Sequence, residues 1–486
     1  MKKIKFDGKK LIRVCNRFSV PLQALGCCLL YFVIEAVSRH SPVEAWRYMT
    51  SRPLIFLYNA FLIFTTTTVV YLFRRRIFAR VMAFSLWLLL GIINGVVLMN
   101  RVTPFTGPDL SLLSDAGKIV GKYISVGELI GIIAALAAFV GFLIWFWFKA
   151  PKCQEKRRWV PDLIVIGGSI VLFAIATHAA LSQRVLSTYF GNIAAAYEDY
   201  GYPYCLSVTI FDTGIQEPNG YSVQLVESIE ASAEETEPDS GETPNIIFLQ
   251  LESFFDPELV NFLNISQDPI PYFRQLKEEY SSGYFRVPAV GAGTINTEFE
   301  AITGMSLRYF GPGEYPYKTI LTERTCESVP YVLKDLGYST HVIHNNEATF
   351  YDRNKVYPML GFDTFTSMEY MPDTTDTTPT GWLKDYILTD EILKCLDSTE
   401  EQDYIYTVSV QGHGDYPEEP VLTNPLIRVT GAQRREKNNY AWEYYCNQIH
   451  EMDEFLRELT EALKDYPEPV ILVMYGDHLP TMGLQT

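Results

Sequence analysis

The chain has 486 residues, a net charge of −17 and a hydrophobic content of 48%. This length exceeds that of one compact domain, and the charge is unevenly spread, with about +15 over residues 1–185 and about −32 over the remainder. The sequence therefore excludes a single domain in one uniform environment, and we expect no nucleic-acid partner.

Five apolar stretches in the first part of the chain have about the 20-residue length of a bilayer-spanning helix. They cover residues 22–37, 54–72, 81–99, 129–148 and 163–180. In a soluble protein, five such stretches in succession would need an improbably large apolar core. The sequence thus predicts a polytopic α-helical membrane domain with five spans.

The orientation of these spans follows from their connections. Basic residues gather in the N-terminal tail, at residues 74–80 and at residues 149–158. By the positive-inside rule all three segments are cytoplasmic. An odd number of spans then places the rest of the chain outside the cell. We therefore expect a multi-pass protein of the cell membrane with a cytoplasmic N-terminus and an extracellular second part.

The segment after the last span differs in composition from its neighbours. Residues 186–222 are rich in tyrosine and weakly periodic, which is typical of a packed connector at the headgroup layer. Residues 226–244 are acidic and small, so they cannot bury a core and are predicted to be a tether. The expected organisation is a membrane domain over residues 1–185, a connector and tether over 186–243, and an extracellular domain over 244–486.

The last part of the chain alternates apolar runs with amphipathic helical segments. The runs cover residues 245–251, 339–343, 404–410 and 470–475, and the helical segments cover residues 270–280, 328–336 and 439–463. Continuous apolar runs are typical of strands buried on both faces in a parallel sheet. The alternation predicts an α/β domain with a mainly parallel sheet covered by helices on both sides.

Each of the four runs leads to a residue that can bind a metal or a phosphate. Glu252 follows the first run, His344 the second, His413 the third, and the pair Asp477 and His478 the fourth. An open α/β sheet keeps its chemistry outside the carboxyl ends of its strands. We therefore expect these side chains to converge on one active site.

A fifth segment adds a hydroxyl, because Thr294 stands in a glycine-containing loop at the head of a predicted helix. With Glu252, Asp477 and His478 it forms an oxygen and nitrogen donor set without thiolate, which suits Mn²⁺, Mg²⁺ or Zn²⁺. A metal-bound threonine hydroxyl has a lowered pKa and becomes a nucleophile. Alternatively, Glu252 caps the following helix and the Asp-His pair is structural.

Thr294 has an alternative role of its own, as the N-cap of the helix that runs through Glu298 to Gly304. The two roles are compatible. At a helix N-terminus the free N–H groups and the helix dipole favour the phosphate that such a threonine would attack.

Further candidates suit a phosphate ester. The Arg353 guanidinium would bind the phosphate through two hydrogen bonds and its charge, and the Tyr351 ring would pack on the alcohol part of the ester. His344 lies within ten residues of both in the sequence. His413 lies in a polar loop and would contact the phosphate or the leaving group, as a general acid. As a bare pattern, however, arginine and tyrosine so spaced are also common on protein surfaces.

Together these motifs resemble the lipoteichoic acid synthase family, membrane-anchored phosphoglycerol transferases of the alkaline phosphatase and sulfatase superfamily. The resemblance includes the five spans, residues 101–109, the first strand, the Thr294 loop, residues 350–353, Gly412-His413 and residues 475–478. It implies an α/β domain of the sulfatase or alkaline phosphatase type.

The resemblance also implies roles for individual residues. The family's metal ligands fall on Glu252, Thr294, Asp477 and His478, with Thr294 as the catalytic nucleophile. Its substrate-binding positions fall on His344, Tyr351, Arg353 and His413. The implied cofactor is a divalent metal, Mn²⁺ first, with Mg²⁺ or Zn²⁺ as alternatives.

The implied reaction transfers glycerol phosphate from phosphatidylglycerol to an extracellular acceptor, a glycolipid or a growing polyglycerol phosphate, through a covalent glycerophospho-threonine. The sequence departs from the family at Tyr351, where well-known members have tryptophan. It also ends soon after His478, so we expect the C-terminal part of the domain to be missing. Thr294 lies in no C/S-x-P-x-R motif, which disfavours sulfate-ester hydrolysis.

Other functions remain open from the sequence. A phosphoglycerol or phosphoethanolamine transferase acting on a glycan or lipid has the same motifs, and so has a phosphodiesterase or hydrolase. From a different class, an inactive receptor or scaffold would have no need for the complete metal-binding set. A transporter is disfavoured, because the spans carry few internal charges.

Overall fold

The computed structural model describes residues 18–100, 103–110, 126–151, 159–188, 190, 193–212, 214–215, 220–232, 243–289, 293–414, 416–432 and 438–482. Some predictions lie outside the described residues: the basic N-terminal tail, Arg101, the basic connection 152–158, tether residues 233–242, the Gly291-Ala292 part of the Thr294 loop, and residues 483–486. The chain forms two compact units, Met1–Asp212 and Thr213–Thr486, and each is described by itself.

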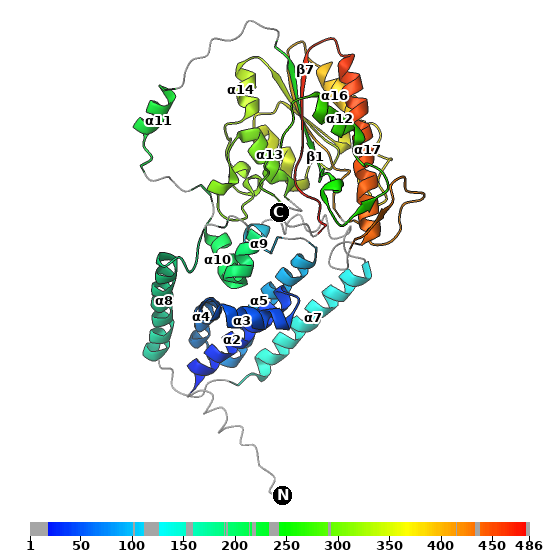
Figure 1. The fold of residues 1–486 in the computed structure, drawn as a ribbon. Helices are drawn as coiled ribbons and strands as arrows, with labels where there is room; N and C mark the ends of the chain where they lie inside the picture. Colours follow the sequence, from blue (N-terminus) through cyan, green and yellow to red (C-terminus); the bar gives the residue numbers. More distant parts are fainter. Residues whose placement is uncertain are drawn as a thin grey trace, which may run out of the picture. The chain divides into compact units, whose positions relative to one another are not determined.

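The first unit is helical (Figure 1). Its helices are α2 (Ser19–Ser38), α3 (Pro42–Ser51), α4 (Pro53–Thr67), α5 (Arg76–Asn100), α7 (Val126–Lys149), α8 (Trp159–Ser182), α9 (Ile193–Tyr200) and α10 (Tyr202–Phe211), with 3₁₀ turns η1 (Thr68–Leu72) and η2 (Pro108–Leu110). In the described part, four segments are long and apolar enough to cross a membrane: Ser19–Ser38, Pro53–Leu72, Arg76–Met99 and Trp159–Ser182. They agree with four predicted spans, and the remaining one, residues 129–148, lies within α7.

The tyrosine-rich segment after α8 packs into this unit. Asn59 on α4 accepts a hydrogen bond from the backbone N–H of Tyr204 at 2.8 Å and donates one to the carbonyl of Tyr200 at 2.7 Å. Between them Gly201 has a φ of 82°, and a Cβ there would lie 2.1 Å from the Tyr31 hydroxyl. These contacts join α9 and α10 to the apolar helices, while the predicted domain boundaries stay a prediction.

The second unit contains a five-stranded sheet in the order β4-β3-β5-β1-β7, all parallel. Its strands are β1 (Asn245–Leu251), β3 (Ser339–His344), β4 (Thr364–Ser367), β5 (Asp403–Val408) and β7 (Val470–Gly476), and a separate antiparallel pair joins β2 (Asn264–Ile265) to β6 (Val429–Thr430). The four predicted strands are confirmed. Gln250 is paired with both Val408 and Tyr475, so β1, β5 and β7 end at one level.

Helices cover both faces of the sheet (Figure 1). They are α12 (Pro271–Glu279), α16 (Ile387–Leu396) and α17 (Asn439–Lys464) on one face, α13 (Thr294–Thr303), α14 (Val329–Asp335) and α15 (Arg353–Met359) on the other, and α11 (Val223–Glu230) precedes the sheet. Along β1, Ile247 and Leu249 pack with Trp442 on one face, while Phe248 packs toward Phe299 on the other. The predicted α/β layering and the predicted helices at α12, α14 and α17 are confirmed.

Candidate functional site

A cluster of three buried side chains lies at the carboxyl ends of β1 and β7. Ligand atoms of Glu252, Asp477 and His478 all lie within 4.8 Å of one another. His478 Nε2 is 3.3 Å from Asp477 Oδ2 and 3.4 Å from Glu252 Oε1. The parallel register of β1 and β7 brings these residues to one point, as the strand endings predicted.

The backbone next to β1 fixes these carboxylates. The N–H of Glu252 donates to Ser409 Oγ at 2.9 Å, which ties the end of β1 to the loop after β5. Ser253 adopts a left-handed conformation with φ 53°, and its N–H donates to Asp477 Oδ1 at 2.7 Å. Non-glycine residues in this region are strained, and such strain clusters at functional sites. The turn after β1 thus orients a carboxylate of β7.

The donor set fits a divalent metal. His478 Nδ1 lies 3.0 Å from the carbonyl of Leu479, which only accepts, so Nδ1 carries the proton and Nε2 presents its lone pair. Asp477 Oδ2 is buried without a hydrogen-bond partner, and burial, together with the charge of Glu252, raises the pKa of Asp477 to about 7. Acceptor atoms facing one another in this way are stabilised by a shared cation, and oxygen with imidazole donors suit Mn²⁺, Mg²⁺ or Zn²⁺.

Thr294 lies beside this cluster as the first residue of α13. Its hydroxyl donates to Glu252 Oε2 at 3.1 Å and lies 3.5 Å from His478 Nε2. The N-cap of α13 is Gly293, with φ 100°, and no side-chain cap bond is made there. The alternative that Thr294 is the N-cap is therefore wrong, because its hydroxyl turns toward Glu252 instead of toward its own helix.

His344 ends β3 and is buried. Its Nδ1 lies 2.9 Å from the carbonyl of Val408, so Nδ1 carries the proton and donates it. Burial, followed by the positive charge of Arg353, lowers the pKa of His344 well below its usual value. His344 is therefore a neutral imidazole whose Nε2 accepts hydrogen bonds.

Arg353 begins α15 and is also buried. Its guanidinium carbon lies 5.4 Å from the ring centre of Tyr351. After burial, its positive charge is the next cause that lowers the pKa of His344, so the guanidinium lies near that imidazole. Burial raises the pKa of Glu252, and the charge of Arg353 is only a smaller contribution that opposes this rise. Tyr351 has a φ of 59°, and this unusual backbone directs its ring toward Arg353.

His413 follows β5 in a turn where its N–H donates to the carbonyl of Val410 at 3.0 Å. Its ring packs on Trp382 with 4.3 Å between ring centres, so the residue is less mobile than its polar loop suggests. β3 and β5 are neighbouring parallel strands, so His344 at the end of β3 and His413 after β5 come to the same edge of the sheet. All the predicted site residues thus gather at one edge of the sheet, and their individual roles stay predictions.

Comparison with known families settles the class of this domain. A family model described as Sulfatase matches residues 244–485. The chain carries a sulfatase-family domain. This family lies in the alkaline phosphatase and sulfatase superfamily that the motifs indicated.

Two curated relatives match about 70% or more of the chain. The chain is 27% identical over 364 residues to a putative cyclic beta-1,2-glucan modification protein of Rhizobium meliloti (strain 1021), covering 74% of this chain and 55% of the relative. It is 24% identical over 362 residues to lipoteichoic acid synthase 1 of Bacillus subtilis (strain 168), covering 70% and 53%. The chain therefore spans about half the length of these relatives.

Among solved structures, the phosphoglycerol transferase GacH of Streptococcus pyogenes in complex with sn-glycerol-1-phosphate is similar at 24% sequence identity. That similarity covers 56% of this chain and 72% of that chain, with a TM-score of 0.43.

The sulfatase domain also contains site-supporting residues that the sequence did not reveal. Asp385 is buried, and its Oδ1 accepts from Asn345 Nδ2 at 2.8 Å and from the N–H groups of Val410 and Gln411 at 3.1 and 3.2 Å. It ties the loop after β3 to the loop after β5. A lone aspartate in a loop gives no such signal in the sequence, since its partners are distant along the chain.

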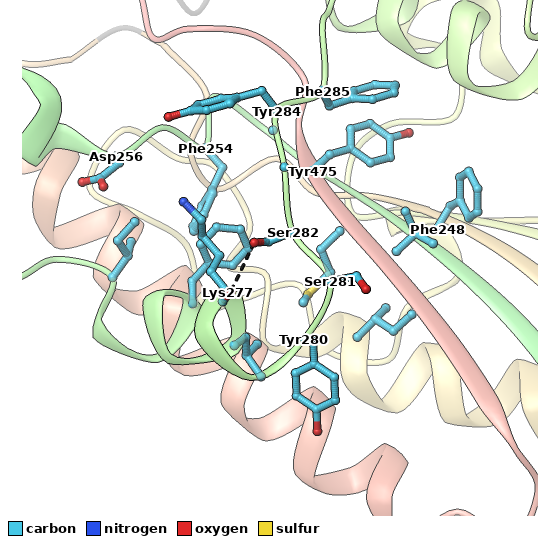
Figure 2. A pocket seen from close by; sticks show the side chains of 18 of the residues that line it. Phe248, Phe254, Asp256, Lys277, Tyr280, Ser281, Ser282, Tyr284, Phe285 and Tyr475 are labelled. Atoms are coloured by element: carbon cyan, nitrogen blue, oxygen red, sulfur yellow. Dashed lines mark hydrogen bonds between the residues drawn. The ribbon is translucent and has the colours of Figure 1, made fainter.

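A cavity of about 1450 Å³ lies alongside β7 of the sulfatase domain. Figure 2 shows its aromatic wall, in which the ring of Phe285 lies 4.7 Å from that of Tyr475. Among the predicted site residues only His478 lines it. β7 pairs only with β1 in the described sheet, so the cavity lies along a sheet edge, and Arg353 does not line it.

Proposed function

We propose that this protein transfers glycerol phosphate from phosphatidylglycerol to an acceptor hydroxyl outside the cell. The observation that carries the proposal is the Thr294 hydroxyl, 3.1 Å from Glu252 in a cluster that fits a divalent metal. The similarity to a lipoteichoic acid synthase supports it. Apolar helices long enough to cross a membrane would keep the enzyme beside its lipid donor.

The proposed cofactor is Mn²⁺, with Mg²⁺ or Zn²⁺ as alternatives, held by Glu252, Asp477, His478 and the Thr294 hydroxyl. When bound, the metal lowers the pKa of that hydroxyl and offsets the two carboxylate charges. Glu252 Oε2, which accepts the hydroxyl proton in a hydrogen bond, orients Thr294 Oγ1 toward the substrate.

In the first step the Thr294 hydroxyl gives its proton to Glu252 Oε2 as Oγ1 forms a bond to the lipid phosphorus, and the bond from phosphorus to the glyceride oxygen breaks. His413 gives a proton to that oxygen, and diacylglycerol leaves. Arg353 donates a hydrogen bond to a non-bridging phosphoryl oxygen, one of the positioned donors by which enzymes stabilise phosphoryl transfer. The product is a glycerophospho-threonine at Thr294.

In the second step the acceptor hydroxyl attacks the phosphorus and gives its proton to His413. The bond from phosphorus to Thr294 Oγ1 breaks and Oγ1 takes its proton back from Glu252, which restores the enzyme. His344, neutral and with a free lone pair on Nε2, accepts a hydrogen bond from a hydroxyl of the glycerol. Tyr351 packs against the carbon chain of the same group.

We propose a glycolipid or a growing polyglycerol phosphate as the acceptor. A glycan acceptor is the second candidate, because a relative at 27% identity is named as a glucan modification protein. Both reactions use the same donor and the same covalent intermediate, and they differ only in the hydroxyl that attacks in the second step.

The donor is tested by reconstituting the protein in vesicles that hold fluorescent phosphatidylglycerol and phosphatidylethanolamine with different dyes. We expect Mn²⁺-dependent release of diacylglycerol from phosphatidylglycerol alone, lost on addition of EDTA. Release from phosphatidylethanolamine instead would identify a phosphoethanolamine transferase. Free glycerol phosphate formed at the same rate, with or without an acceptor, would identify a hydrolase.

We also propose that the N-terminus is cytoplasmic and that the sulfatase domain lies outside the cell. The test labels single cysteines with a membrane-impermeant maleimide. Thr374→Cys, at an exposed position of the domain, should react in intact cells, whereas Arg74→Cys, in an exposed basic connection, should react only after permeabilisation. The reverse pattern would overturn this orientation.

A further inference from the structure

Glu298 lies one helical turn after Thr294 on α13, and it is fully buried. Its carboxylate accepts hydrogen bonds from Arg353 Nε, at 3.2 and 3.3 Å, and from Arg353 Nη2. The hydroxyls of Tyr317 and Tyr357 donate to Glu298 Oε2 at 3.1 and 2.9 Å. Glu298 thus links the helix of the nucleophile to the guanidinium that faces the phosphate.

The pair formed by Glu298 and Arg353 is buried and carries no net charge. Burial disfavours the guanidinium charge, but the carboxylate of Glu298 outweighs this effect and raises the pKa of Arg353. Arg353 therefore remains charged, and the carboxylate of Glu298 balances its charge. Buried ion pairs of this kind are retained for geometry and specificity more than for stability.

One donor of Arg353 is left over. Nη1 is buried without a hydrogen-bond partner, while Nε and Nη2 are held by Glu298. A buried donor without a partner is costly, so this N–H group is available to a ligand oxygen. Because Glu298 lies one helical turn after Thr294 on α13, the guanidinium that it holds is tied to the helix that begins with Thr294.

Apart from His413 and a bound metal, the nearby cationic side chains add little positive charge. His344 is neutral, and Lys318, on the segment between α13 and α14, is paired with Asp352 at 2.7 Å. Attraction to a ligand scales with the product of charges, so an uncompensated arginine would favour a dianion over a monoanion, whereas a neutral pair would not.

We propose that Glu298 is a positioning residue that aims Arg353 Nη1 at the phosphate and cancels the arginine charge, so that the site selects phosphodiester monoanions over phosphomonoester dianions. This inference rests on the proposed function, because it takes Arg353 as the phosphate contact. A lipid donor, the covalent intermediate and the transferred product are all phosphodiesters, whereas a free phosphomonoester would act only as a competitor.

The test measures binding of two ligands by calorimetry to the Mn²⁺-loaded full chain. They are sn-glycerol-1-phosphate and its methyl ester, and at pH 8 the first is a dianion, since its second pKa is about 6, while the second is a monoanion. The wild type should bind the methyl ester at least as tightly as the monoester. Glu298→Gln keeps the shape and removes the charge, and it should shift the ratio of the two Kd values about tenfold toward the monoester.

Tyr357→Phe is the matched control, because it removes one hydrogen bond to Glu298 without changing a charge. It should leave the ratio as in the wild type. If Glu298→Gln changes the Kd values of both ligands by the same factor, Glu298 has only a structural role and the inference is wrong.

A second variant covers the case in which Glu298→Gln does not fold. The double variant Glu298→Gln, Arg353→Gln removes both charges together, so neither charge is left buried without its partner. It should bind both ligands more weakly with the wild-type ratio, and a changed ratio would overturn the inference. Failure of the folded wild type to bind either ligand would instead contradict the proposed function.

Discussion

Replacing Thr294 with alanine is expected to abolish the release of diacylglycerol from phosphatidylglycerol. If Thr294 Oγ1 is the nucleophile, no other group of the protein takes its place, and the rate should fall by about 10⁴-fold or more. Thr294 is the first residue of α13, where alanine is an excellent helix former. The variant therefore loses mainly its hydrogen bond to Glu252, about 1 kcal/mol, and should fold normally.

Two variants of the same helix separate chemistry from folding. Thr294→Ser keeps a hydroxyl at the same position and should retain measurable transfer. Thr303→Ala makes the same chemical change at the other end of α13, where the hydroxyl bonds only to the backbone of Phe299 and Met305. That variant should transfer at nearly the wild-type rate. Full activity of Thr294→Ala would show that another group, such as water, attacks the phosphorus.

The four longer strands could be predicted from the sequence because each contains a run of apolar, β-branched or aromatic residues. β4 could not, since it has only four residues, two of them threonine, and lies at the edge of the sheet. Its pairing with β3 depends on contacts that the local pattern does not contain. The same limit applies to β2 and β6, which have two residues each.

The site could be predicted where chemistry follows a strand end, as at Glu252 and Asp477. Glu298 was missed although it lies four residues after Thr294 and hence on the same face of α13. Its meaning depends on Arg353, which is 55 positions away in sequence. Trp382 was missed for the same reason, because its contact with His413 forms only when two distant loops meet.

Asp477→Asn is expected to have opposite effects on function and on stability. It removes a charged ligand from the cluster, so Mn²⁺ should no longer raise the melting temperature and transfer should fall by about 10³-fold. Without metal, the variant should be more stable than the wild type. The amide keeps an acceptor for the N–H of Ser253 and removes a buried negative charge beside Glu252.

The pH dependence follows from the pKa of Asp477, which is raised to about 7. Between the ordinary pKa of an aspartate and about pH 7, Asp477 binds a proton in the folded state but not in the unfolded state. The free energy of unfolding therefore falls as the pH rises toward 7. Above pH 7 the full cost of the buried charge is present. In EDTA at pH 8 the variant should therefore exceed the wild type by roughly 1–3 kcal/mol, and the difference should vanish near pH 4. Thermal melting in EDTA and in Mn²⁺ measures both effects.

Asp453→Asn supplies the matched control, since Asp453 is equally buried but accepts from the N–H groups of Tyr272 and Phe273 at the start of α12. It should lower stability in EDTA and in Mn²⁺ alike and leave the metal-dependent increase intact. If Asp477→Asn instead melts below the wild type in EDTA, its carboxylate is a structural group. If Asp477→Asn melts above the wild type in EDTA but below it in Mn²⁺, the fold tolerates an unfavourable buried charge at this position because a cation binds there.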